Sequence, residues 1–253
     1  VGETEYYMRI TVCKMMADMA EKLGKTCDFE FFTEKAISAE NEYKKEYFKN
    51  GVFSSAKQSP NLYALSLNIL NEKEKAVTAQ RLKEEIIFNG KHLDTGIFGI
   101  QHFIEVLSDL NSADLALDCF LNPEYPSFAN QINRGATTLW EQWCGKGDMS
   151  SNNHAMFAGA INGFYTRLAG IVPLENGFET ARIKPIITKY LSKLKFKFNS
   201  VQGKYEINYK INGGEFFMSV IIPPNTKAEI ELPNGEMFKV GNGKFEFKCS
   251  LQS

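Results

Sequence analysis

Apolar residues recur every three or four positions through the first two thirds of the chain, a spacing that predicts a series of helices. The first helix is marked by Tyr6, Ile10, Cys13, Ala17 and Ala20, and Gly24 supplies its C-terminal stop. Asp28 is expected to cap the second helix and Ser59 the third, with Pro60 at a first helical position. Short links between helices are typical of antiparallel helical hairpins. After the first helix, the predicted helices cover residues 28–48, 59–70, 72–88, 99–110, 112–121 and 152–171.

The pattern changes near Pro173 to the two-residue alternation of β-strands. In residues 192–200, Leu194, Phe196 and Phe198 alternate with Lys193, Lys195 and Lys197. Asn212-Gly213 is a hairpin signal, and Pro-Asn-Gly and Gly-Asn-Gly turns separate the short strands that follow. This part of the chain therefore predicts an antiparallel β-sandwich, placed after a mainly helical region.

Charge supports two domains, residues 1–172 and 173–253. The first holds 17 Lys and Arg against 22 Asp and Glu, whereas the second holds 12 against 8. The whole chain of 253 residues has a net charge of -1, so no basic field indicates a nucleic-acid partner. There is no apolar run of about 18 residues, and a membrane partner is not expected.

Sequence motifs narrow the chemistry further. The chain has no phosphate-binding glycine loop, no HExxH and no paired His/Cys spacing, so neither a cofactor nor a metal is expected. The first residues lack an initiator Met and signal-peptide features, as in a chain that begins inside a domain, so they give no targeting information. The five cysteines are dispersed and odd in number, which favours reduced thiols and a reducing compartment, the cytoplasm over secretion.

Both tryptophans of the chain flank one carboxylate in "RGATTLWEQW", residues 134–143. One interpretation is a sugar site, with Glu141 as a catalytic carboxylate and the indole faces of Trp140 and Trp143 beside the pyranose. The alternative is that the two tryptophans anchor a loop and Glu141 is a solvated neighbour. Glycoside hydrolysis needs a second carboxyl group, so one acid beside tryptophan does not decide between them.

Two other connections carry ionisable groups. His154 follows the helix-capping residues Ser151, Asn152 and Asn153, and is expected in the first turn of a helix, either contacting a sugar or satisfied within the fold. His92 and Asp94 lie in "HLDTG", residues 92–96, where Asp94 and Thr95 could cap a helix that starts near Ile97. The functional reading places His92 or Asp94 in contact with a ligand.

The order of these segments resembles the C-terminal region of bacterial α-L-rhamnosidases, glycoside hydrolase family 78. The segments are "SAKQSPNLYALSLNIL", "GKHLDTGIFGIQHFIEVLSDLNSADLALDCFLNPEYPSF", "RGATTLWEQW" and "SSNNHAMFAGAINGFYTRLAGIVP". The resemblance implies the second half of an (α/α)6 toroid of six helical hairpins, followed by a C-terminal β-sandwich. It also implies hydrolysis with inversion of terminal rhamnose from a glycoside or polysaccharide.

The resemblance maps a general base onto Glu141, a rhamnose contact onto His154 and a pocket wall onto Trp140. Trp143, Asn153, His92 and Asp94 complete the expected substrate-binding set. The family's general acid belongs to an earlier acidic, Arg-containing segment, and nothing like it is found here. "HLDTG" also has Asp94 where a second threonine is expected.

These departures predict a truncated or partial product, or one piece of a nicked protein, that is inactive alone. Half a toroid would carry an exposed apolar seam, available for self-association or for packing on the missing half. Two other functions stay open. One is a non-catalytic carbohydrate-binding or scaffold module, and the other is a six-hairpin glycosidase specific for another sugar.

Overall fold

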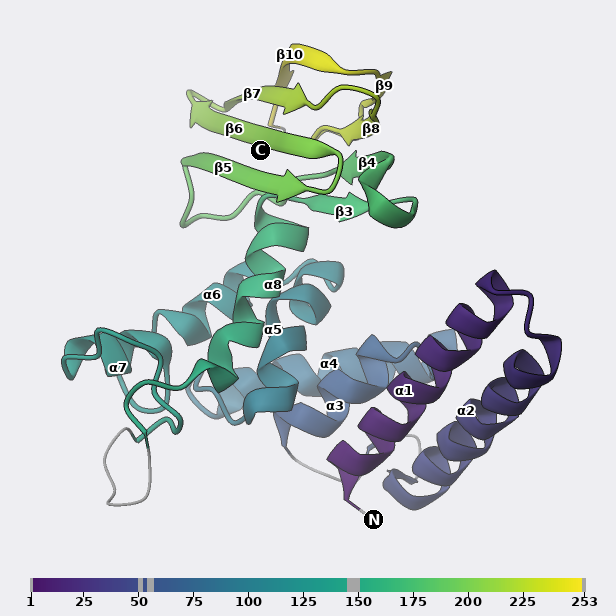
Figure 1. The fold of residues 1–253 in the computed structure, drawn as a ribbon. Coiled ribbons are helices and arrows are strands. Elements are labelled where there is room, and N and C mark those ends of the chain that lie inside the picture. Colours follow the sequence, from purple (N-terminus) through teal and green to yellow (C-terminus); the bar gives the residue numbers. More distant parts are fainter. Residues whose placement is uncertain (1, 50–51, 54–56, 145–150, 252–253) are drawn as a thin grey trace. The chain divides into compact units, whose positions relative to one another are not determined.

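The computed structural model describes residues 2–49, 52–53, 57–144 and 151–251 (Figure 1). The chain separates into two compact units, one of Val1–Val106 with Asp118–Gly159 and one of Leu107–Leu117 with Ala160–Ser253. Helices α5 (Ile97–Asp109) and α6 (Ala113–Phe120) pass from one unit into the other. The domain boundary near residue 172 stays a prediction.

The first unit is built mainly from helices. Helices α1 and α2 form an antiparallel hairpin, and the left-handed φ of Gly24, +66°, lies in the turn between them. The predicted stop at Gly24 is therefore confirmed. The other elements of this unit are short strands, further helices and a 3₁₀ helix near its end. The bounds are α1 (Glu3–Lys22), α2 (Thr26–Tyr47), β1 (Phe48–Lys49), β2 (Val52–Phe53), α3 (Gln58–Ser66), α4 (Glu72–Phe88), α7 (Phe128–Asn133) and the 3₁₀ helix Ala155–Ala160, whose last residue falls in the second unit.

Tyrosines dominate the core that joins α1, α2 and α3. Tyr7 on α1 stacks on Tyr63 of α3 with ring centroids 4.6 Å apart, and Tyr43 of α2 is fully buried. Aromatic side chains bury much apolar area while their hydroxyls still reach polar partners. This shared aromatic core packs α1, α2 and α3 together.

Helix starts differ from the predicted caps at two places. Helix α2 begins at Thr26 after Lys25, so Asp28 lies in its first turn, where a carboxylate is still favoured by the helix dipole. Helix α3 begins at Gln58, so Pro60 is the third helical residue and Ser59 the second. The N–H groups of a first helical turn have no partner within the helix, which is why proline is tolerated there.

His102 of α5 is a buried group whose protonation should affect stability. Its Nε2 lies 2.6 Å from the Tyr7 hydroxyl oxygen, and burial lowers its pKa from the usual 6.5, against a smaller opposing effect of Glu105. Below about pH 6.5 the unfolded chain therefore binds more protons than the folded one. The free energy of unfolding should fall as pH drops from 6.5 toward the lower folded-state pKa.

Urea unfolding at several pH values, on wild type and His102→Gln, measures this contribution. The wild type should lose more stability than the variant between about pH 7.5 and about pH 5. Parallel curves for the two proteins would mean that His102 protonation is not linked to unfolding.

The segment after His154 is less regular than predicted. A single helix was expected over 152–171, but 3₁₀ turns over Ala155–Ala160 precede α8 (Ile161–Gly163) and a π-helical turn, Phe164–Leu168. His154 therefore precedes the first helical turn instead of lying in it. A Cβ at Gly159 would come within 2.9 Å of the Gln101 Cβ, so this close approach to α5 requires glycine.

The second unit contains a β-sandwich, confirming the predicted order of helices and then strands. Two four-stranded sheets, β10-β7-β6-β5 and β3-β4-β8-β9, bury one shared apolar core that includes Tyr205, Phe216 and Ile230 (Figure 1). The bounds are β3 (Ile171–Pro173), a 3₁₀ turn (Asn176–Phe178), β4 (Thr180–Ile183), β5 (Lys193–Ser200), β6 (Gly203–Asn212), β7 (Glu215–Ile222), β8 (Lys227–Glu231), β9 (Met237–Val240) and β10 (Gly243–Ser250).

Strand pairing shows two details that the alternation of apolar and polar residues did not predict. The β6–β7 hairpin forms, but its two turn residues are Gly213 and Gly214, both with positive φ, and Asn212 pairs with Glu215. Strands β4 and β8 are parallel, within sheets that are otherwise antiparallel.

No helix in the described ranges is long and apolar enough to cross a membrane. The five cysteines are all free thiols.

Candidate functional site

Two segments singled out in the sequence lie against each other in the first unit. The backbone N–H of Glu141 donates to the carbonyl of Ser151 at 2.9 Å, and that of His154 donates to Leu139 at 2.8 Å. The Thr138 hydroxyl also donates to the Asn152 carbonyl. These three bonds hold the two segments against each other. Residues 145–150, which join them, lie outside the described residues.

Glu141 is partly buried and oriented by one strong contact. Its Oε2 accepts a hydrogen bond from the backbone N–H of Ser151 at 2.6 Å. Bonds to an ionised carboxylate are short and about twice as strong as neutral ones, so this contact holds the side chain in one orientation. Within the described part of the chain, the other oxygen, Oε1, has no hydrogen-bond partner. Among the described residues, then, one oxygen is used for positioning and the other has no protein partner.

His154 is held through one ring nitrogen. Its Nδ1 accepts a hydrogen bond from the backbone N–H of Met156 at 3.2 Å, which caps the 3₁₀ turns. In a neutral imidazole the nitrogen that accepts carries no proton, so the proton lies on Nε2. The Nε2–H of a partly exposed His154 is then a directed donor. Asn153 beside it is exposed, with its backbone N–H on the Ser151 hydroxyl.

The two tryptophans have different surroundings. Trp140 is buried, and the Arg134 guanidinium carbon lies 5.5 Å from its ring centroid. Trp143 packs against Phe157 and Phe128, with centroids 4.2 and 5.0 Å away. Contacts of this kind make Trp143 an anchor of its connection, so a sugar contact by this indole stays a prediction.

Trp143 also ties the "HLDTG" segment to the others. Its indole N–H donates to the Thr95 carbonyl at 2.9 Å, and the Thr95 hydroxyl lies 2.8 Å from that of Ser59. Thr95 is therefore engaged with α3, although α5 does start at Ile97 as predicted. The structure brings residues 92–96, 138–143 and 151–157 into one cluster of connections.

Gln58 was not identified from the sequence. Its side-chain amide bonds the backbone of residues 92–94 and so holds this part of the cluster in place. Its side chain is 1% exposed, its Nε2 donates to the His92 carbonyl at 2.7 Å, and its Oε1 accepts from the Asp94 N–H at 2.8 Å. Both amide atoms thus bond backbone groups on either side of Leu93. No short-range motif marks such a residue, because its partners lie 34 and 36 positions away.

Replacing Gln58 by Leu should destabilise the protein by about 2 kcal/mol, because two backbone groups would lose their partners. The control is Gln80→Leu at an exposed position of α4, where the Gln80 amide donates to Glu84 and a change within about 0.5 kcal/mol is expected. Denaturant unfolding of both variants measures the difference. Equal, small effects would show that the clamp contributes nothing to stability.

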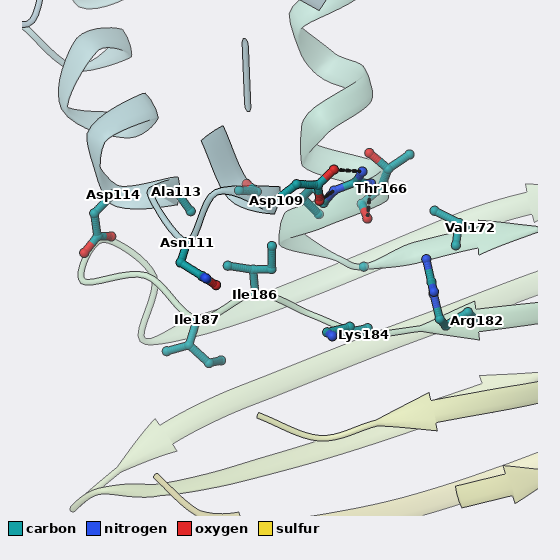
Figure 2. Close-up of a pocket in the computed structure, with 13 residues that line it drawn as sticks. Asp109, Asn111, Ala113, Asp114, Thr166, Val172, Arg182, Lys184, Ile186 and Ile187 are labelled. Carbon is teal, nitrogen blue, oxygen red and sulfur yellow. Dashed lines mark hydrogen bonds and ion pairs between the residues drawn. The ribbon is translucent and has the colours of Figure 1, made fainter. Parts of the chain in front are cut away.

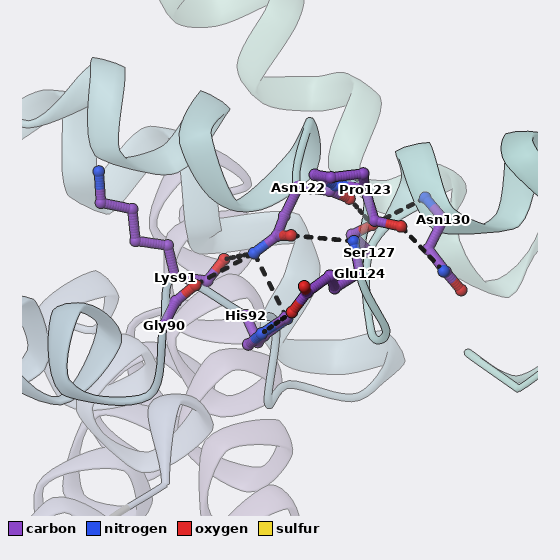
Figure 3. A network of polar contacts seen from close by, with 8 residues as sticks. All are labelled: Gly90, Lys91, His92, Asn122, Pro123, Glu124, Ser127 and Asn130. Carbon is purple, nitrogen blue, oxygen red and sulfur yellow. Dashed lines mark hydrogen bonds and ion pairs between the residues drawn. The ribbon is translucent and has the colours of Figure 1, made fainter.

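His92 belongs to a polar network around Asn122 (Figure 3). The Asn122 Nδ2 donates to the carbonyls of Gly90 and Lys91, both at 3.1 Å, and lies 3.4 Å from the His92 Nδ1. The Glu124 carboxylate is 3.7 Å from the other ring nitrogen of His92. The imidazole of His92 is thus engaged in holding two connections together. Asp94, by contrast, is exposed.

A cavity of about 590 Å³ lies elsewhere, within the second unit (Figure 2). The bidentate pair of Arg167 with Asp109, at 2.8 and 2.9 Å, lies on its wall. Asp114 accepts from the Lys189 backbone N–H at 3.0 Å. None of the residues predicted for sugar chemistry lines this cavity. Arg167 neutralises the Asp109 carboxylate on this wall.

Among the described residues, no three or more His, Cys, Asp or Glu side chains gather as a metal site would require. The two bonded segments carry a positioned carboxylate, Glu141, and an imidazole donor, His154. A carboxylate with one free oxygen can take a proton from water, and an imidazole N–H can bond a hydroxyl.

Comparison with known proteins gives two matching family models. One is described as the bacterial α-L-rhamnosidase six-hairpin glycosidase domain and matches residues 2–168, and the other as the bacterial α-L-rhamnosidase C-terminal domain and matches residues 170–245. An α-L-rhamnosidase of Formosa agariphila is 34% identical over 244 residues, which is 92% of this chain and 26% of that protein. One of Streptomyces avermitilis is 27% identical, over 87% of this chain and 22% of that protein.

Solved structures agree with these matches. An α-L-rhamnosidase of Dictyoglumus thermophilum has a TM-score of 0.87 and 28% identity, covering 97% of this chain and 31% of that one. The Streptomyces avermitilis α-L-rhamnosidase complexed with L-rhamnose also has a TM-score of 0.87, at 25% identity, covering 94% of this chain and 26% of that one. This chain spans about a quarter of the length of the curated relatives that it matches.

Proposed function

Because this chain belongs to the bacterial α-L-rhamnosidase family of six-hairpin glycoside hydrolases, we propose that it forms the general-base side of a site that hydrolyses terminal α-L-rhamnosides. The observation that carries the proposal is the Glu141 carboxylate. One of its oxygens is fixed on the Ser151 N–H and the other has no partner in the described chain. A base of this kind is oriented before substrate arrives, which is what proton transfer in a transition state requires.

The proposed reaction inverts the anomeric configuration. Glu141 Oε1 takes a proton from a water molecule, whose oxygen attacks the anomeric carbon while the bond from that carbon to the leaving oxygen breaks. A second carboxyl group protonates the leaving oxygen from the opposite face of the sugar. The two carboxyls of an inverting enzyme stand about 6.5–9.5 Å apart, leaving room for the water.

The other residues of the cluster are proposed to bind or position the sugar. His154 donates from Nε2 to a rhamnose hydroxyl, since its Nδ1 is occupied by the Met156 N–H. Asn153 and Asp94, which are exposed, reach further hydroxyls, and Trp140 lines the pocket wall. Trp143 and His92 act through the connections that they hold together.

We place the second carboxyl group on a segment outside these 253 residues. Helix α1 supports this, because an exposed apolar set lies along it and at its C-cap: Met8, Val12, Met15, Met16, Met19 and Leu23. At 100° per residue these six side chains fall on one face of about 100°, the width of a core-facing stripe. Leu23 is 72% exposed and Met15 59%, as expected of a helix that packs on further protein. The polypeptide that carries this chain together with that segment is called the parent polypeptide below.

Hydrolysis by the parent polypeptide tests the function. It should release nitrophenol from p-nitrophenyl α-L-rhamnoside with a kcat/KM at least about 100-fold above that for glycosides of other sugars, since lost hydroxyl contacts strongly penalise the wrong substrate. Preferential cleavage of another sugar would assign a different six-hairpin specificity. Binding of rhamnose without turnover would assign a carbohydrate-binding module instead.

A further inference from the structure

In the sheet β10-β7-β6-β5, the strand register places one row of outward-facing side chains across all four strands. Lys193 on β5 is directly opposite Lys210 on β6, which is opposite Phe217 on β7, which is opposite Lys248 on β10. These four residues are called the lysine row. The residues that alternate with them along β6 and β7, such as Tyr209 and Met218, are buried in the sandwich core.

The lysine row is unfavourable without an anion. Side chains directly opposite on antiparallel strands have Cβ atoms about 4.5–5.5 Å apart, and like charges in such pairs are destabilising. Lys193 and Lys210 are both exposed, and no carboxylate in the described ranges pairs with either. Lys248 has a partner, Glu215, at 2.8 Å.

On the same face of the sheet, two rows away, lysine is paired with glutamate. There Lys197 is opposite Glu206, with Nζ and Oε1 3.8 Å apart, and Lys204 also contacts Glu206 at 2.5 Å. These lysines lower the pKa of the Glu206 carboxyl, Lys204 first. The same two strands therefore pair lysine with glutamate in one row and lysine with lysine in another. A surface where like charges face each other, within a sheet that elsewhere pairs opposite charges, is typical of a functional site.

Phe217 gives the lysine row an apolar centre. It is partly buried in an outward-facing position, and the Nζ atoms of Lys210 and Lys248 each lie 5.2 Å from its ring centroid. Because these lysines belong to the strands on either side, the ring is bordered by ammonium groups on both sides. An aromatic platform bordered by cations suits a ligand that has both an apolar face and negative charge.

The lysine row lines a shallow groove of about 950 Å³. Beside it in the groove lie Lys195, Asn208, Ser219 and Glu246, one from each strand. Glu246 is the carboxylate of the groove, and it is paired with Lys244 at 2.9 Å. Strands are about 4.8 Å apart, so the row extends about 14 Å from Lys193 to Lys248. That length fits several linked units of a polymer better than one small ion.

We propose that this groove binds an acidic oligosaccharide, a short chain of sugars that carry carboxylate groups. Lys193, Lys210 and Lys248 pair with the carboxylates, and Phe217 stacks on the C–H face of a sugar ring. A glycan is favoured over nucleic acid because the row offers one aromatic platform and the chain has a net charge of -1. Such a site would hold the protein on an acidic polysaccharide and does not depend on the role of Glu141.

The test is titration calorimetry of the 253-residue chain with oligogalacturonate at low salt, compared with its methyl ester of the same length. The acid should bind at least about tenfold more tightly than the neutral ester, and binding should weaken as salt is raised through the range where screening shortens to about 8 Å. Equal affinity for acid and ester would overturn the proposal, and so would no binding of the acid.

Matched variants locate the site. A triple variant, Lys193→Gln/Lys210→Gln/Lys248→Gln, should weaken oligogalacturonate binding at least about tenfold, because three exposed carboxylate contacts together are worth about that factor. Lys45→Gln/Lys75→Gln/Lys227→Gln removes the same charge from exposed lysines elsewhere and should change affinity less than about twofold. Equal losses in the two triple variants would show binding by overall charge and overturn the proposal.

Two further variants separate a binding role of the row from a structural one. Lys193→Gln should not lower the midpoint of thermal unfolding, because it removes a repulsion, whereas a structural role for the row would lower it. Phe217→Ala should weaken binding of the acid about threefold or more. A sulfated dextran oligosaccharide or a single-stranded oligonucleotide that binds more tightly than oligogalacturonate would reassign the groove and overturn the carboxylate ligand.

Discussion

The 253-residue chain on its own should cleave an aryl α-L-rhamnoside at least about 1,000-fold more slowly than the parent polypeptide, because we place the general acid on a segment outside it. A positioned general acid contributes about 10²–10⁴-fold to a rate. The leaving group of p-nitrophenyl rhamnoside needs less protonation than a sugar leaving group does. The deficit should therefore be larger on a rhamnosyl disaccharide than on the aryl substrate.

Initial rates of both proteins on both substrates provide the measurement. Circular dichroism and the free energy of unfolding, taken on the same samples, confirm that the isolated chain is folded. If the isolated chain matches the parent polypeptide on the disaccharide, the acid lies within these 253 residues and our placement of it is wrong.

Glu141→Gln in the parent polypeptide should lower kcat by about 10²–10⁴-fold while changing KM little. The glutamine side chain keeps a carbonyl oxygen that can still accept from the Ser151 N–H, so the paired segments stay in place. It cannot take a proton from water, so only the transition state loses stabilisation. The effect on kcat/KM should therefore equal that on kcat.

Glu30→Gln is the matched control, because Glu30 is exposed on α2 and makes the same change of charge and shape. It should leave both kinetic constants within about twofold of wild type. A Glu141→Gln enzyme with a raised KM and an unchanged kcat would make Glu141 a binding residue and not a base.

The sequence predicted those helices and strands that depend on contacts between residues close together in the chain. Helix α4 follows its pattern over Glu72–Phe88, and Asn71 caps it by accepting from the Glu74 N–H at 2.9 Å, a local contact. The β6–β7 hairpin likewise follows from alternation and a glycine turn. Both depend on interactions within a few positions of the chain, which propensity and period describe well.

Features set by distant contacts were not predictable. The parallel pairing of β4 with β8 joins Ala181 to Ala228, and alternation indicates a strand but not its neighbour. The broken helix after His154 reflects the approach of Gly159 to Gln101 on α5. Tertiary packing of this kind overrides a local helical period.

The candidate site divides in the same way. Glu141 and His154 stand out because of residue type and surroundings in the sequence. Gln58 and Asn122, which hold the connections around them, act through amide groups on backbone atoms about 30 positions away. Every residue type offers the same backbone groups, so the sequence of the partner does not reveal a side-chain to backbone bond. Only the structure identifies residues such as Gln58 and Asn122.

The most direct test of the central claim is the product that a base-less enzyme forms with azide. In the parent polypeptide carrying Glu141→Gly, azide can occupy the space of the lost carboxylate and attack the anomeric carbon as the aryl oxide leaves, without needing a base. The configuration of the product, read by NMR, reports which face Glu141 serves. We expect azide to restore turnover and to give the β-L-rhamnosyl azide, inverted relative to the substrate. An α-L-rhamnosyl azide, or no rescue by azide in a folded variant, would contradict the assignment of Glu141 as the general base.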